Sequence, residues 1–263
     1  MFHLSISNIA WRSEDDESIY KKVVELGFSG IEIAPTRIVS NSPYDHIEEA
    51  KKWKNELELK YGLLIPSMQS IWYGRIEKIF GSEEDRRGLI DYTKKAVDFA
   101  EAVGCKNLVF GCPKNRCIPE DGDEETAKIF FQELGDYAYE HDTVIAIEPN
   151  PAIYNTNFLN STSETISFIE RIVSKGIRLN LDAGAMVEND ETVDVLSKKG
   201  HLIHHVHISE PGLGVIKKHG LHRNLRDFLH EIQYAGFVSL EMNNESGLQD
   251  IYESLKYVKE VFQ

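Results

Sequence analysis

The sequence predicts an α/β protein whose residues 1–263 form a single (β/α)₈ TIM-barrel domain. Short runs rich in β-branched residues alternate with longer amphipathic, charged segments, and the alternation repeats eight times. Four helical segments end at a glycine, which can supply the left-handed cap that leads into the next strand. These are Gly27, Gly104, Gly176 and Gly236. The repeated unit favours a closed parallel barrel over an open sheet.

Each expected strand is followed by an expected helix, and no linker or low-complexity tract divides the chain. Strands are expected at 2–7, 30–33, 63–69, 107–110, 143–148, 177–182, 203–208 and 238–241, because these runs are short, apolar and β-branched. Helices are expected at 13–26, 45–61, 84–103, 124–141, 163–174, 191–199, 224–235 and 249–262, where apolar residues recur with helical spacing.

Composition argues against several classes of partner. The hydrophobic fraction of 41% and the charged fraction of 27% are ordinary for a globular protein. The net charge of −14 is unfavourable for nucleic acid, whose binding relies on Lys and Arg. No run approaches the roughly 18 apolar residues of a membrane span, and the first residues lack the basic region of a signal peptide. We therefore expect a cytoplasmic protein, with Cys105, Cys112 and Cys117 as reduced thiols.

Four polar residues close successive apolar runs: Glu148, Asp182, His207 and Glu241. They are separated by 34, 25 and 34 residues, and each gap is about one strand and one helix of a barrel. They should therefore meet at the C-terminal rim, where barrel enzymes carry their active sites. Carboxylates with one imidazole suit a divalent cation, and the two glutamates could also move protons. The pattern predicts a metal site.

Side chains alternate between the two faces of a strand, so the residues beneath the four can be sorted. Asn180 shares the inward face with Asp182, and His205 shares it with His207. Buried polar groups need hydrogen-bond partners. We therefore expect Asn180 and His205 to orient the metal ligands.

Several short stretches around these strand ends form a known pattern. They are GIEI at 30–33, EPNP at 148–151, YNTNFLN at 154–160, LDAG at 181–184, HVHISEP at 205–211 and SLEM at 239–242. Across essentially the whole chain the sequence resembles the xylose-isomerase-like TIM-barrel superfamily. Within it, the pattern is most similar to the sugar phosphate isomerase/epimerase group, which includes ketose 3-epimerases.

The resemblance implies a metal-dependent isomerase or epimerase that acts on a sugar or sugar phosphate through a cis-enediolate. One divalent ion would be held by Glu148, Asp182, His207 and Glu241. Mn²⁺ is the expected ion, with Mg²⁺, Co²⁺ or Zn²⁺ as alternatives. Glu148 and Glu241 would flank the reacting carbon as catalytic acid and base, one removing the proton and the other returning it. Many relatives are dimers or tetramers, so a homo-oligomer is a further possibility.

Two departures from the family pattern bear on the substrate. Ala185 stands where the epimerases commonly carry a histidine, and residues 210–214 lack an arginine that several of them carry. Nearby Lys217, His219 and His222 could replace these groups. A basic segment after the seventh expected strand could also bind the phosphate of a sugar phosphate.

Other residues at the expected rim are candidates for substrate binding. Glu32 and Gln69 could bind sugar hydroxyls, and Asn150 and Tyr154 follow Glu148 directly. Sugars present C–H faces that pack on aromatic rings, so an apolar wall is expected from indole side chains. The candidates for that wall are Trp11 and Trp72.

Three other functions remain open on the same barrel. A dehydratase of an inositol- or sugar-derived ketone would use the same proton abstraction and then lose water. An apurinic endonuclease would need a three-metal cluster with more histidines and would have to bind DNA despite the charge of −14. A non-catalytic sugar-binding barrel would bind a ligand without exchanging its protons with solvent.

Overall fold

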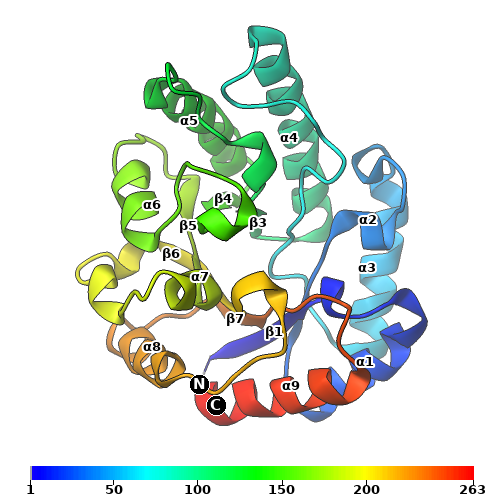
Figure 1. Ribbon diagram of the computed structural model, residues 1–263. Coiled ribbons are helices and arrows are strands. Elements are labelled where there is room, and N and C mark those ends of the chain that lie inside the picture. Colours follow the sequence, from blue (N-terminus) through cyan, green and yellow to red (C-terminus); the bar gives the residue numbers. More distant parts are fainter. Residues whose placement is uncertain (1) are drawn as a thin grey trace.

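The computed structural model describes residues 2–263 and has the expected α/β barrel architecture, with a ring of helices around a curled parallel sheet (Figure 1). Seven strands pair in the order β2-β1-β7-β6-β5-β4-β3. Every pairing is parallel. The strands are β1 His3–Ser7, β2 Gly30–Glu32, β3 Asn107–Phe110, β4 Val144–Ile147, β5 Ile177–Asp182, β6 Ile203–Ile208 and β7 Phe237–Leu240.

The third expected strand, 63–69, is not continuous. Leu64 forms a parallel bridge with Gly30, and Met68 forms bridges with Ile33 and Leu108. Pro66 lies between them and has no N–H to donate to a ladder, which accounts for the interruption. The segment still joins β2 to β3, so it closes the barrel.

Gly30 permits this irregular segment to approach β2. A Cβ atom at Gly30 would lie 2.9 Å from both Pro66 Cδ and Phe237 Cε1, so a larger residue would displace the segment.

The helices match most of the expected segments. They are α1 Asp16–Glu25, α2 Pro35–Ile38, α3 Ile47–Tyr61, α4 Glu83–Val103, α5 Glu124–Glu140, α6 Thr162–Ile169, α7 Ala183–Glu188, α8 Gly220–Glu231 and α9 Leu248–Phe262. None of these helices, within residues 2–263, combines the length and apolar character that a membrane crossing requires.

The expected helix 191–199 is wrong. That stretch contains only the 3₁₀ turn Val193–Leu196, and Lys198 has a φ of 62°, which a right-handed helix cannot accommodate. The helix that follows β5 is instead the short α7. Asp182 caps it by accepting hydrogen bonds from the backbone N–H groups of Gly184 and Ala185.

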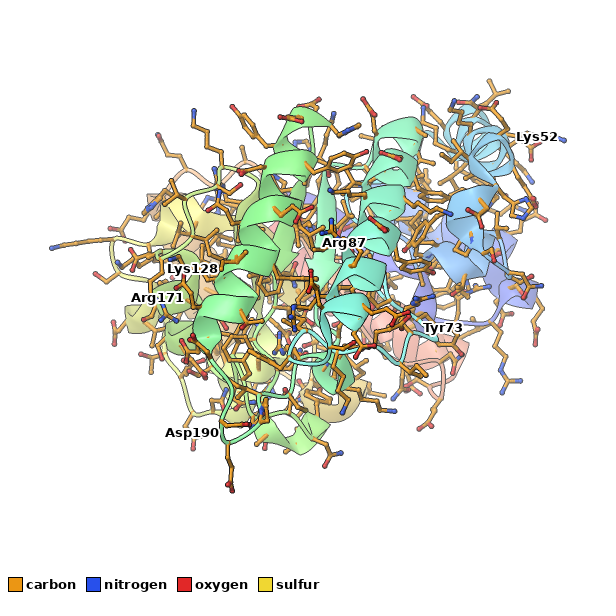
Figure 2. All side chains as sticks on the ribbon, turned by 90° about the horizontal axis from the view of Figure 1, so that it is seen from above. Lys52, Tyr73, Arg87, Lys128, Arg171 and Asp190 are labelled. Atoms are coloured by element: carbon orange, nitrogen blue, oxygen red, sulfur yellow. The ribbon has the colours of Figure 1, made fainter. Side chains whose placement is uncertain are left out.

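An apolar layer between the sheet and the helices holds the rim in place. Aromatic side chains pack edge to face through this layer, with ring centroids 4.8 Å apart for Trp72 and Phe110 and again for Phe110 and Phe131. Charged side chains such as Arg87 on α4 and Lys128 on α5 lie on the outside (Figure 2). The strand ends are therefore fixed by a rigid core.

Candidate active site

Four adjacent strands bring the expected ligands to the C-terminal end of the barrel. Glu148 follows β4, Asp182 ends β5, His207 lies in β6 and Glu241 follows β7. Asp182 is directly opposite His207 in the β5–β6 register. His207 is fully buried, and the three carboxylate residues are 6–9% exposed.

His207 is at the centre of the cluster. Its Nδ1 lies 2.9 Å from Glu148 Oε1 and 3.2 Å from Glu241 Oε2. Donor atoms of these three residues all lie within 4.8 Å of one another. On the other side of the ring, Nε2 lies 2.9 Å from Glu32 Oε2. Nδ1 is therefore the ring nitrogen that faces the two glutamates.

Asp182 lies beside this group of three. Its carboxylate accepts hydrogen bonds from Gly184 N at 3.0 Å, from Ala185 N at 3.2 Å and from the hydroxyl of Ser209. Burial, together with the negative charges of Glu148 and Glu241, raises the pKa of Asp182 to about 7. The aspartate is thus held in place by the start of α7 and repelled by the two glutamates.

Repulsion among these buried carboxylates favours a cation bound between them. Burial raises the pKa of Glu241, and the charges of Glu148 and Glu32 add to the effect against the opposing influence of His207. Burial lowers the pKa of His207, but Glu32 and Glu241 outweigh it and raise that pKa well above its usual value. Three carboxylates and an imidazole are a donor set that suits Mn²⁺ or Mg²⁺. A divalent ion would relieve this repulsion, which otherwise favours the protonated form of the Asp182 and Glu241 carboxyl groups.

Asn180 contacts two of the expected ligands. Its Nδ2 donates to Glu148 Oε1 at 2.7 Å and lies 3.2 Å from His207 Nδ1. His205 behaves differently: its Nε2 lies 3.1 Å from Glu32 Oε2, and its ring packs edge to face on that of His207, with centroids 5.3 Å apart.

A pocket opens directly above the cluster. It is lined by Gln69, Ser70, Val109, Gly111, Cys112, Pro113, Glu148, Asn150, Tyr154, Asp182, Leu213 and Glu241. Three of the expected substrate-binding residues, Gln69, Asn150 and Tyr154, are therefore in the pocket wall. Among the residues that the structure describes, the lining contains three carboxylates and no Lys, Arg or His.

The two tryptophans and Glu32 lie elsewhere than expected. Trp11 is 2% exposed and donates its indole N–H to Asp16, whereas Trp72 is 3% exposed and donates to Thr93. Each indole N–H is satisfied away from the pocket, so both rings pack in the core. The apolar part of the pocket wall is formed instead by Val109, Pro113 and Leu213. Glu32 is fully buried beneath His207.

The expected phosphate-binding segment is also outside the pocket wall. His219 Nε2 lies 2.9 Å from Glu210 Oε1, and the same oxygen accepts a hydrogen bond from Lys217 N at 2.8 Å. His222 is fully buried, with Nδ1 3.1 Å from Tyr257 Oη. Glu210 therefore fastens the loop between β6 and α8, whereas His222 joins α8 to α9.

Sequence reasoning missed Arg116, which is fully buried behind the site. Its Nη1 donates to the backbone oxygen of Glu148 at 2.8 Å, and its Nη2 donates to that of Leu159 at 3.0 Å. Burial lowers its pKa to about 10. A single arginine in a loop gives no periodic signal, so only the contacts identify it.

Gly111 was missed as well. A Cβ atom at this position would lie 2.9 Å from Glu148 Oε2, so a side chain here would press against that carboxylate. A glycine directly after the expected strand 107–110 was the available signal.

Comparison with known proteins places this geometry in a family. Residues 20–261 match the family model described as xylose isomerase-like TIM barrel. A D-psicose 3-epimerase of Enterocloster bolteae is 30% identical over 128 residues, which are 46% of this chain. The match spans only 41% of that relative's length.

Solved structures of low sequence identity share the fold along their whole length. The D-psicose 3-epimerase with D-tagatose from Clostridium cellulolyticum H10 gives a TM-score of 0.81 at 15% identity, covering 99% of each chain. The 3-keto-D-glucoside 4-epimerase of E. coli gives 0.79 at 22% identity, covering 99% of this chain and 100% of that one. Because the family model matches residues 20–261, which are most of the chain, this chain belongs to the xylose isomerase-like TIM-barrel family.

Proposed function

We propose that this protein is a metal-dependent epimerase or isomerase of an unphosphorylated ketose. The main support for the proposal is the arrangement of residues at the pocket. Glu148 and Glu241 line the pocket and converge on His207, and Asp182 lies in the same pocket wall. The partial match to a D-psicose 3-epimerase supports the same class of reaction.

A neutral sugar suits the pocket better than a sugar phosphate. A phosphate carries about two negative charges and usually binds to Arg, Lys or backbone N–H groups. The described lining offers three carboxylates and no cationic side chain, and His219 is engaged by Glu210. A phosphorylated substrate would be repelled, whereas hydroxyl groups can bind to Gln69, Asn150 and Tyr154.

The residues proposed to hold the ion are Glu148, Asp182, His207 and Glu241, and Mn²⁺ is the ion we favour. When bound, a divalent cation would supply Lewis-acid polarisation of the ketose carbonyl. His207 would contribute Nδ1, because Nε2 is directed toward Glu32.

Glu148 and Glu241 are the proposed acid and base. They reach the centre of the pocket from two different strand ends, so a carbon bound between them would face one carboxylate on each side. One glutamate would remove the proton from the carbon next to the carbonyl, and the other would deliver a proton to the opposite face. The raised pKa of Glu241, caused first by burial, favours a group that can both hold and release a proton.

Proton exchange from solvent tests the reaction. The protein with Mn²⁺ would be incubated in D₂O with D-fructose, D-psicose and D-tagatose, beside D-fructose 6-phosphate. We expect deuterium next to the carbonyl, an inverted or isomerised product, and preference for the unphosphorylated sugars. Loss of water from the substrate would indicate a dehydratase. Sugar binding without deuterium uptake would indicate a non-catalytic barrel.

A cytoplasmic location and a homo-oligomeric state remain predictions. Cell fractionation and light scattering of the purified protein would test them.

A further inference from the structure

Glu32 occupies an unusual position for a residue expected to bind sugar. It ends β2, is fully buried, and lies on the side of His207 that faces away from Glu148 and Glu241. Both of its oxygens are engaged: Oε2 lies 2.9 Å from His207 Nε2, and Oε1 accepts a hydrogen bond from Gln69 Nε2 at 3.0 Å. A carboxylate with these partners has no free oxygen for a substrate hydroxyl.

We infer that Glu32 is a positioning residue that fixes the orientation and tautomer of His207. The inference rests on the proposed metal-dependent function. An imidazole that binds a metal is neutral, with one N–H and one lone pair, and a carboxylate beside Nε2 favours the proton there. The lone pair is then on Nδ1, the atom on which Glu148 and Glu241 converge at 2.9 and 3.2 Å. Carboxylates that hold a metal-binding histidine in this way raise its basicity.

Glu32 also reaches a second proposed ligand through Gln69. Gln69 Nε2 lies 3.0 Å from Glu32 Oε1, 2.9 Å from Glu241 Oε1 and 2.7 Å from Ser7 Oγ. One buried carboxylate on β2 is therefore connected directly to His207 and, through one amide, to Glu241. Both ligands are held before a metal arrives, which reduces the conformational entropy lost on binding.

A second metal ion is the competing explanation for the same residues. Donor atoms of Glu32, His205 and His207 lie within 4.8 Å of one another. Glu32 Oε2 can accept a hydrogen bond from His207 Nε2 at 2.9 Å, whereas His205 Nε2, 3.1 Å from the same oxygen, has no hydrogen-bond partner among the described residues. The number of ions bound per chain separates the two explanations.

Mn²⁺ titration of Glu32→Gln tests the positioning role without relying on turnover. The substitution preserves the shape of the side chain and removes the charge that favours the Nε2 proton. We expect one Mn²⁺ per chain in both proteins, bound about 10- to 100-fold more weakly by the variant. Glu210→Gln is the matched control, because it neutralises another buried carboxylate that contacts an imidazole and should leave Mn²⁺ affinity unchanged.

The ring ¹⁵N spectrum of His207, recorded with Mg²⁺, supplies a readout that general destabilisation would not produce. We expect the Nε2–H tautomer in the wild type and a mixture of tautomers in Glu32→Gln. Gln69→Met is the second variant, which tests the link to Glu241 even if Glu32→Gln fails to fold. It should weaken Mn²⁺ binding less than Glu32→Gln does.

The outcomes distinguish the positioning role from the proposed function. A wild type that binds no Mn²⁺ would overturn both. Wild-type binding with unchanged affinity and tautomer in Glu32→Gln would overturn only the positioning role. Two ions per chain, with one lost in Glu32→Gln, would show that Glu32 is itself a ligand.

Discussion

This barrel contains two clusters of carboxylates and imidazoles, one among the ends of several strands and one in the segment that follows β6, and they differ in charge balance. The ligand cluster, which contains the four proposed metal ligands, surrounds His207 with four carboxylates: Glu32, Glu148, Asp182 and Glu241. The loop cluster, formed by Glu210, His219 and His222, has one carboxylate for two imidazoles. The same residue types thus occur in opposite proportions.

The difference in charge balance separates the proposed metal site from a structural contact. Glu210 is satisfied within its loop by His219 and by the backbone N–H of Lys217. In the ligand cluster, repulsion by Glu148 and Glu241 adds to burial and raises the pKa of Asp182 to about 7. A surplus of buried negative charge favours a cation. Identifying a site therefore depends on counting unmatched charge as well as on finding ligand-type residues.

The largest effect should come from Glu241→Gln in the ligand cluster. It removes a proton carrier and replaces a carboxylate ligand with a weaker amide, so we expect kcat to fall by at least about 10²- to 10⁴-fold. Steady-state kinetics on the ketose that shows the fastest deuterium exchange would measure the loss. Glu245→Gln, an exposed neutralisation four residues later, is the control. Turnover near the wild-type level in Glu241→Gln would remove Glu241 from the mechanism.

His207→Ala should abolish stoichiometric metal binding, because it removes the imidazole on which the glutamates converge. Mass spectrometry of protein purified without chelator should find about one equivalent in the wild type and much less in the variant. His219→Ala is the matched control from the loop cluster and should retain the metal. Equal metal content in all three proteins would contradict the proposed ligand set.

His219→Ala should instead affect stability. It leaves the buried Glu210 carboxylate without its imidazole partner, and we expect a loss of about 1–3 kcal/mol in the free energy of unfolding. Urea unfolding would measure it. KM should change equally for phosphorylated and unphosphorylated sugars. A selective rise in KM for the phosphorylated sugar would restore the phosphate-binding role of the loop.

The smallest effect is a pH dependence of stability caused by His222. Burial, with a contribution from His219, lowers the pKa of His222 from 6.5 to about 4 against the opposing charge of Glu210. Between these values the unfolded chain binds more protons than the folded protein, so stability falls as the pH falls from 6.5 toward 4.

His222→Phe should reduce this slope by at most about 1.4 kcal/mol per pH unit. Unfolding of both proteins at pH 7 and pH 5 would measure the difference. Parallel pH profiles would show that His222 does not titrate as described.

The sequence alone predicted the barrel and all four residues of the proposed ligand set. Strand periodicity is local, so the strand that carries Glu148, Asp182, His207 or Glu241, and the end at which each residue lies, could be inferred from spacing. Parallel strands in sequence order then place those ends together. The same alternation predicted that Asn180 lies against the expected ligands, and its Nδ2 donates a hydrogen bond to Glu148 Oε1.

Only the tertiary structure decided which side chains meet across the barrel. Glu32 and His207 are 175 residues apart, and no local period relates them. The same holds for Arg116, which lies behind Glu148 and 32 residues from it. The burial of the two indoles, Trp11 and Trp72, in the core was likewise decided by packing. The periodicity of the sequence determines on which face of a strand a side chain lies and at which end of the strand it stands. The contacts that side chains make across a closed sheet depend instead on packing and charge pairing.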